Sequence, residues 1–221
     1  MPLVDLSHDV VHGMVTYPGL PGPVISDYLG WEESGERYAP GTEFRIGRID
    51  LVANTGTYLD TPAHRYRSGD DLARLALERC ADLVGVCVRV AESTIGPEAF
   101  AGVDVAGLAV LFATGWDVHW GSDSYGDPEH PHLTRDAATA LVARRAALIG
   151  IDSVNIDATT GGERPVHSIL LAAGIPIVEH LTGLDRLADP AGGELPFRFF
   201  AVPVKVADMG TFPVRAFAIT G

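Results

Sequence analysis

The sequence contains a single lysine, Lys205, and its 16 basic residues stand against 29 acidic ones, which gives a net charge of −13. Nucleic-acid binding depends on clustered Lys and Arg side chains that displace counterions from phosphates, so this balance argues against a nucleic-acid partner. The acidic excess favours solubility and suits cation binding. The charge itself indicates no particular substrate; the small-molecule substrate that we expect follows from the residues discussed below.

Cysteines and long apolar segments are also scarce. Cys80 and Cys87 are too few for a disulfide framework, and we expect reduced thiols at a helix end and in a buried strand. No apolar run approaches the roughly 20 residues that cross a bilayer. The segment Met1–Asp5 lacks the basic region and apolar core of a signal peptide. These absences predict a cytoplasmic protein with no membrane partner.

What the sequence does contain is a series of apolar runs and helix signals typical of an α/β protein. Its 47% hydrophobic and 20% charged residues are usual for a globular chain, and its length favours one domain over residues 1–221. The apolar patterns predict strands at 3–6, 44–51, 81–90, 108–113, 148–152, 175–179, 197–206 and 213–219, and helices at 72–77, 137–147 and 165–173. Prolines and glycines predict a long loop over 11–43.

The stretch 54–64 interrupts this pattern with a dense group of polar residues. Gly56 allows a backbone turn that a side chain would block, and Pro62 favours an extended Thr61. We therefore expect a rigid polar loop that carries Asp60 and His64 into a common space. An aspartate with a histidine four residues later indicates a metal or acid–base site, although a hydrogen-bonded surface turn has the same pattern.

A second group of polar residues belongs to a predicted βαβ unit made of strand 148–152, helix 165–173 and strand 175–179. A crossover connection places both strand ends and the helix start at one edge of the sheet, where ligands of open α/β sheets bind. Asp152, His167 and Glu179 should converge there. Glu179 ends an apolar strand, so its carboxylate must be paired, coordinated or reached by solvent.

In order and spacing, several motifs resemble the cyclase family of metal-dependent hydrolases, which includes bacterial kynurenine formamidases and isatin hydrolases. The matching segments are 5–8, 17–19, 57–64, 114–116, 150–153, His167 with Glu179, and 209–215. The resemblance spans nearly the whole chain. It implies a swivelling β/β/α fold, with mixed sheets and flanking helices, and a homodimer or homotetramer.

The resemblance also implies roles for individual residues. Members of the family carry two metal-binding histidines in the central motif, at the positions of Asn54 and Tyr58 here. The implied metal ligands that remain are Asp60, His167 and Glu179, and the implied catalytic histidine is His64. Within the matched motifs, we expect Tyr17, Thr57 and Trp116 to bind substrate.

The two replacements change the chemistry of the site. Asparagine offers only a neutral carbonyl oxygen, and tyrosine binds metal only as a phenolate, far below its ordinary pKa of about 10. A second zinc is therefore not expected, and Asp60, His167 and Glu179 suit one Zn²⁺ or Mn²⁺ per chain. The alternative is no metal, with Asn54 and Tyr58 as donors to an oxyanion and His64 as the base.

Three functions follow from these residues. The first is a hydrolase of a small amide, formamide, lactam or ester, acting on non-peptide C–N bonds as the formamidases do. The second is a metal-independent cyclase or dehydratase of a carbonyl-rich metabolite, in which His64 enolises the substrate and Tyr58 polarises a carbonyl. The third is a non-catalytic binding protein that has kept the fold.

Overall fold

The computed structural model describes residues 1–187 and 196–221, and a curved sheet of nine strands forms its centre. The order across the sheet is β1-β13-β11-β5-β7-β9-β10-β4-β12. The strands are β1 (Leu3–Asp5), β13 (Phe217–Thr220), β11 (Phe197–Phe200), β5 (Leu83–Arg89), β7 (Ala109–Ala113), β9 (Leu148–Ile151), β10 (Ile177–Glu179), β4 (Tyr58–Asp60) and β12 (Thr211–Pro213). The central strands β5, β7, β9 and β10 are parallel, and the outer ones pair antiparallel.

Shorter elements surround this sheet. Two further strand pairs are β2 (Val24–Leu29) with β3 (Ile46–Asp50), and β6 (Thr94–Ile95) with β8 (His132–Leu133). The α-helices are α1 (Trp31–Arg37), α2 (Pro62–Arg65), α3 (Arg135–Ala143) and α4 (Pro165–Ala172). The 3₁₀ turns are η1 (Leu77–Arg79), η2 (Pro97–Phe100), η3 (Trp116–His119), η4 (Asp123–Gly126) and η5 (Leu184–Leu187).

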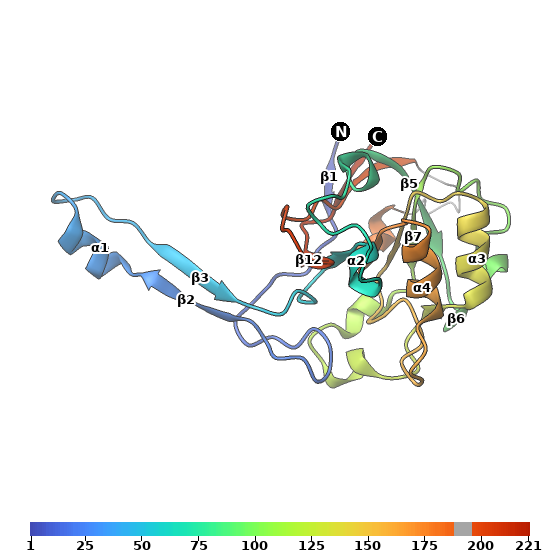
Figure 1. Cartoon of the computed structure of the whole chain (residues 1–221), viewed down its shortest axis with the longest axis horizontal. Helices are drawn as coiled ribbons and strands as arrows, with labels where there is room; N and C mark the ends of the chain where they lie inside the picture. The colour runs from blue at the N-terminus through green and yellow to red at the C-terminus, as the bar shows by residue number, and fades with distance from the viewer. Residues whose placement is uncertain (188–195) are drawn as a thin grey trace.

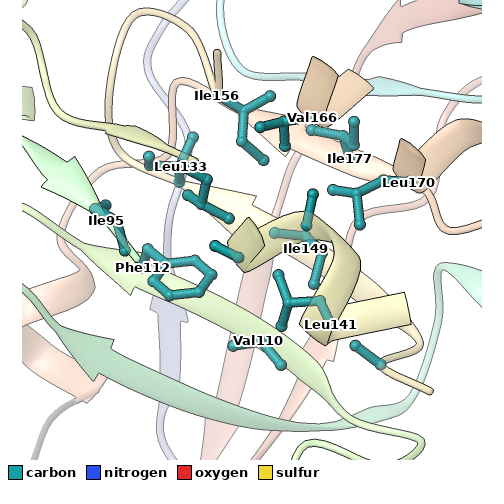
Figure 2. Packing of buried hydrophobic residues seen from close by; sticks show 14 of the residues in the cluster. Ile95, Val110, Phe112, Leu133, Leu141, Ile149, Ile156, Val166, Leu170 and Ile177 are labelled. Carbon is teal, nitrogen blue, oxygen red and sulfur yellow. The ribbon is translucent and has the colours of Figure 1, made fainter. Parts of the chain in front are cut away.

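Alternation along the central strands creates two apolar clusters, one on each face of the sheet. Val110 and Phe112 of β7 pack into the first cluster, whereas Leu111 between them belongs to the second. Figure 2 shows the first cluster, where Leu141 of α3 and Leu170 of α4 lie against the sheet. In Figure 1 both helices cover this face side by side. The second cluster joins residues of the central strands, such as Leu111, to residues of the antiparallel outer strands, such as Phe199 of β11 and Ala218 of β13.

The predicted α/β class is confirmed, and so are the buried strands β5, β7 and β9 and the helices α3 and α4. Thr134 caps α3 as its sequence position indicates, because its hydroxyl accepts a hydrogen bond from the Ala137 N–H. Pro165 occupies the first turn of α4, and β10 runs parallel to β9, so the βαβ unit is also confirmed. The expected helix at 72–77 is wrong, since only the single turn η1 forms near its end.

Residues 11–43 differ most from expectation, because they contain β2 and α1 rather than loop alone. Together with β3 these elements form an arm, residues 24–50, that projects from the body of the molecule in Figure 1. Five of the six residues of β2 and all five of β3 are exposed. The predicted strand at 44–51 is confirmed as β3. Its partner β2 was missed because both faces of the hairpin meet solvent, so the β2 sequence has no clean polar–apolar alternation.

The sequence predicted reduced cysteines and no membrane-spanning segment, and the structure bears on both predictions. Cys80 and Cys87 are free thiols, and burial raises the pKa of the first to about 11 and that of the second to about 12, so neither is a reactive thiolate at neutral pH. In the part of the chain that the structure describes, no helix has the length and apolar character that crossing a membrane requires.

Candidate functional site

Asp60 lies at the floor of the site, fully buried at the end of β4. We expected a loop here, but residues 58–60 form a strand between β10 and β12. Within it, Asp60 lies opposite Ile177 of β10 on one side and Thr211 of β12 on the other. Oδ1 accepts a hydrogen bond from the Thr211 hydroxyl. Oδ2 is buried and has no hydrogen-bond partner among the described residues. A buried carboxylate oxygen without a hydrogen bond is costly, so this atom is available to a cation.

His64 is carried by α2, which begins at Pro62 directly after the extended Thr61. The chain at Gly210 passes so close that a Cβ there would lie 2.2 Å from the backbone nitrogen of His64. The glycine is therefore required for this packing, and it places Thr211 beside the ring, with Oγ1 2.7 Å from Nδ1. Since the Thr211 hydroxyl donates to the Asp60 carboxylate, its oxygen accepts from Nδ1–H of His64. This leaves Nε2 as the unprotonated, basic nitrogen.

His167 lies in the first turn of α4, where Asp157 fixes it. The Asp157 carboxylate accepts hydrogen bonds from the backbone N–H of Val166 at 2.7 Å and of His167 at 3.0 Å, and it lies 2.7 Å from Nδ1 of the ring. It thus caps the helix and orients the imidazole, as carboxylates do behind metal-binding histidines. Nε2 then points to Asp60 Oδ2 and Glu179 Oε1, at 3.6 Å from each.

The charge of His167 follows from its neighbours. Burial alone lowers the pKa of an imidazole, but the carboxylates of Glu179, Asp157 and Asp60 outweigh it and raise the pKa of His167 to about 10. Without a cation the ring therefore holds a proton between two carboxylates. A metal ion would take the place of that proton, because the same atoms that favour the imidazolium favour a divalent cation.

Glu179 faces His167 from the end of β10, but hydrogen bonds already engage both its oxygens. Oε1 accepts from the Ile156 N–H at 2.6 Å, and Oε2 accepts from the Tyr58 hydroxyl at 2.7 Å. The pKa of Tyr58 is raised well above its ordinary value by burial and by the charge of Glu179, so the hydroxyl keeps its proton. Tyr58 is thus a fixed donor to Glu179.

Behind Tyr58 the hydrogen bonding continues through His180, which is fully buried. Nε2 of His180 lies 3.2 Å from the Tyr58 hydroxyl, and Nδ1 lies 2.8 Å from the Tyr125 hydroxyl. Burial lowers the pKa of His180 to about 3, so the ring is neutral and has one donor and one acceptor. Because the Tyr58 hydroxyl donates to Glu179, its oxygen accepts from Nε2–H of His180, and Nδ1 of His180 accepts from the Tyr125 hydroxyl. The series of hydrogen bonds therefore runs from Tyr125 through His180 and Tyr58 to the Glu179 carboxylate.

A cavity of about 640 Å³ opens above these groups. This volume suits a small molecule. Its lining includes six of the nine residues predicted for the site, namely Tyr17, Asn54, Tyr58, His64, His167 and Glu179. Asp60 lies beneath the two imidazoles, within 3.6 Å of each. The structure therefore brings seven predicted residues to one place.

Thr57 and Trp116 do not line this cavity. The Thr57 hydroxyl donates to the carbonyl of His180 at 2.5 Å and accepts from the backbone of His8 at 3.1 Å, so it holds two segments together. The Trp116 indole N–H donates to the carbonyl of Tyr125 at 3.0 Å. Both side chains serve the scaffold behind the site.

The expected convergence of Asp152 with His167 and Glu179 is wrong. The Asp152 carboxylate accepts hydrogen bonds from the Thr114 backbone and hydroxyl and from the Gly115 N–H, between 2.6 and 3.1 Å. These donors come from the loop after the neighbouring strand β7, and they hold the side chain away from the cavity. Asp152 therefore stabilises that loop.

Sequence reasoning also missed Asp157, Thr211 and His180. Asp157 lies in a Thr- and Gly-rich loop ahead of the predicted helix 165–173, and the loop pattern does not indicate that its carboxylate reaches the His167 ring. Thr211 is 147 residues from His64, although it belongs to the matched segment 209–215, which was the available signal. His180 directly follows Glu179, but nothing in the sequence indicates its two tyrosine partners.

The side chains at the floor of the cavity could hold a metal ion, but this group differs in one residue from the predicted ligands Asp60, His167 and Glu179. In the described ranges 1–187 and 196–221, one group of three His, Cys, Asp or Glu side chains has ligand atoms within 4.8 Å of one another: Asp60, His64 and His167. Glu179, predicted as a ligand, is outside this group but within 3.6 Å of His167. The unpartnered Asp60 Oδ2 is the observation that favours a cation here.

Comparisons with known proteins place the chain in a family. A kynurenine formamidase of Salinibacter ruber is 28% identical over 98% of this chain and 96% of its own length, and one of Bacillus cereus is 26% identical over 96% and 95%. The solved isatin hydrolase A of Labrenzia aggregata superposes with a TM-score of 0.81 at 22% identity, over 99% of this chain and 93% of that one, which establishes the fold. The family model described as "Putative cyclase" matches residues 4–158. The chain belongs to the cyclase family.

Proposed function

We propose that this protein is a hydrolase of a small amide, of the class that includes aryl formamides and lactams. The observation that carries the proposal is the buried Asp60, whose unpartnered Oδ2 faces His167 at the floor of a cavity that also exposes His64. The full-length similarity to kynurenine formamidases supports a non-peptide C–N bond as the target. Esters of similar size fit the same chemistry.

The residues present fit one divalent cation, and we infer Zn²⁺ or Mn²⁺. Asp60 and His167 would hold it, with Glu179 or His64 as the third ligand. When bound, such an ion polarises a carbonyl and lowers the pKa of water. Neither Asn54 nor Tyr58 adds a metal ligand, because the Tyr58 hydroxyl is protonated and bonded to Glu179 and asparagine offers only a neutral carbonyl oxygen.

The side chains of the cavity divide the remaining work. His64 takes a proton from the attacking water at Nε2, since Thr211 holds the other nitrogen protonated, and it returns the proton to the leaving amine. Asn54 lines the cavity and is the better donor to an oxyanion, because the Tyr58 proton is already given to Glu179. Tyr17, which lines the cavity, would contact the substrate.

The test combines metal content with activity on a simple aryl formamide. We expect about one zinc or manganese per chain by elemental analysis, and hydrolysis of formanilide that a chelator abolishes and metal restores. Metal-free protein with full activity would remove the ion from the proposal. His64→Gln should keep the metal and lose roughly 100-fold or more in kcat; loss of the metal in this variant would make His64 a ligand.

A second candidate is a metal-independent cyclase or dehydratase, favoured by the two hydrogen-bonding residues, Asn54 and Tyr58, at positions where family members carry histidines. The double variant Asn54→His/Tyr58→His separates the two functions. A gain of metal and of formamide hydrolysis favours a reduced hydrolase site. Loss of native turnover without such a gain favours the cyclase, and no turnover in any form favours a binding protein.

We also propose a cytoplasmic homodimer or homotetramer, in which the arm of residues 24–50 contacts another subunit. Its exposed side chains include Tyr28 at 71% and Trp31 at 54% exposure. A two-stranded hairpin of this kind has little stability alone, so a partner surface would support it. Light scattering of the wild type and of Tyr28→Ser/Trp31→Ser tests this, with a shift to monomer as the expected result.

A further inference from the structure

The mouth of the cavity carries positive charge in a protein that is otherwise strongly acidic. Three arginines line it, namely Arg65, Arg135 and Arg164, against one acidic residue of the rim, Glu163. The chain as a whole has 29 acidic and 16 basic residues, so this local balance is the reverse of the general one. A cationic entrance favours an anionic ligand.

Two of the three arginines already have structural partners. Nη1 of Arg164 donates to the carbonyls of Ala158, Gly161 and Glu163, and so it holds the loop before α4. Arg135 pairs with Glu163 at 3.2 Å, with both side chains more than half exposed. Such a pair contributes little and competes weakly with a ligand.

Arg65 differs from both. Its Nε donates to the hydroxyl of Ser168 at 3.2 Å, which fixes the direction of the side chain. Neither Nη group donates to an acceptor in the part of the chain that the structure describes. The open side of the guanidinium is the fork that matches a carboxylate in two parallel hydrogen bonds.

The Arg65 guanidinium lies close in the fold to His64 and His167. Arg65 follows His64 on α2, and its anchor Ser168 follows His167 on α4. The rings of these two histidines lie 5.8 Å apart between centroids. The guanidinium is thus attached to both elements that carry the imidazoles, on the wall of the same cavity.

We propose that the substrate is an amide bearing a carboxylate close to the scissile C–N bond, and that Arg65 binds this carboxylate. The inference rests on the proposed amide hydrolysis and names the substrate class for the same site. The cavity volume of about 640 Å³ suits a compact molecule, such as a single aromatic ring with both groups attached.

Binding is measured first, because it does not depend on turnover. Calorimetry with benzoate and benzamide compares a carboxylate with a neutral amide of the same shape. We expect the wild type to prefer benzoate, and Arg65→Gln to lose about 10- to 100-fold in benzoate affinity, the range for a charged hydrogen-bonded pair. Arg65→Lys should fall between them, since an ammonium lacks the fork. Arg67→Gln, an exposed arginine of the same segment outside the cavity lining, should behave as wild type.

Turnover then locates the carboxylate relative to the amide. The substrates are formanilide and 2-, 3- and 4-formamidobenzoate, and we expect one acid isomer to exceed formanilide by tenfold or more in kcat/KM. Arg65→Gln should reduce that excess mainly through KM, far more than it affects formanilide.

Two results would overturn the inference. Equal binding of benzoate and benzamide by the wild type would show that the cavity does not select a carboxylate, and loss of benzoate binding in Arg67→Gln to the same extent would show a diffuse charge effect. If none of the formamides is hydrolysed, the proposed function fails, but Arg65-dependent benzoate binding would still support a carboxylate ligand.

Discussion

The two halves of the site differ in how far their buried polar atoms are hydrogen-bonded. The open half consists of Asp60, His64 and His167, and the closed half consists of Glu179, Tyr58, His180 and Tyr125. In the open half the buried Oδ2 of Asp60 has no hydrogen-bond partner among the described residues, and the imidazole of His167, 3.6 Å away, is held in its charged form. In the closed half, hydrogen bonds link Glu179, Tyr58, His180 and Tyr125 in series, and burial keeps the imidazole of His180 neutral.

This difference identifies where a ligand binds and where the protein provides a fixed wall. A group with an unsatisfied buried atom is stabilised when a ligand arrives, whereas a satisfied network resists any ligand that would break it. Tyr58, at a position where the family resemblance implies a metal-binding histidine, therefore closes one half of the site with hydrogen bonds. The other half keeps the capacity to bind a cation and to move a proton.

The largest expected effect comes from a matched pair of amide substitutions across the two halves. Asp60→Asn should lower kcat/KM for formanilide by about 1,000-fold, since a bound ion contributes several kcal/mol of transition-state stabilisation. Glu179→Gln should lower it by only about 10- to 100-fold, because hydrogen bonds from Ile156 and Tyr58 already engage both Glu179 oxygens and make it the weaker candidate ligand. Steady-state kinetics and metal content measure both, and equal losses in the two variants would break the comparison.

Thr211 gives the next effect, because it sets the proton position on His64. Thr211→Val removes the hydroxyl that links the Asp60 carboxylate to Nδ1. We expect kcat to fall about 10- to 100-fold with little change in KM. Thr211→Ser keeps the hydroxyl and should restore most of the activity; if serine fails to rescue, the link does not control the proton.

The sequence predicted the site residues that depend on local signals, and it failed for residues whose partners come from distant segments. His167 and Glu179 were placed correctly because they end elements of a βαβ unit whose apolar runs, proline and glycine are local signals. Asp152 also ends such a strand, but its partners Thr114 and Gly115 belong to another loop, and only the folded chain brings those donors to it. Hydrophobic periodicity reports burial of an element; it carries no record of which hydrogen bonds form between distant segments.

His180 supplies a prediction about stability rather than turnover. His180→Leu leaves the hydroxyl of Tyr125 without its acceptor and removes the donor to Tyr58. Each unsatisfied buried group costs about 1–3 kcal/mol, so the free energy of unfolding should fall by that order. Denaturant unfolding measures it, and Trp120→Phe is a suitable control because the Trp120 ring packs edge-on against His180, with no hydrogen bond between the two side chains, and phenylalanine keeps an aromatic ring there. Unchanged stability in His180→Leu would mean that the closed half is not a satisfied network.

The smallest effect is a pH dependence that separates the two kinds of buried histidine. Burial lowers the pKa of His8 and His130 to about 4, below the value of about 6.5 in an unfolded chain. At pH 4–6.5 the unfolded chain thus binds more protons, so the stability these rings contribute is complete above pH 6.5 and is lost as the pH falls towards 4. The slope is at most about 1.4 kcal/mol per pH unit for each ring. Unfolding curves of wild type and His130→Gln should show a shallower slope in the variant. An unchanged slope would mean that this imidazole is protonated in the folded protein, as His167 is.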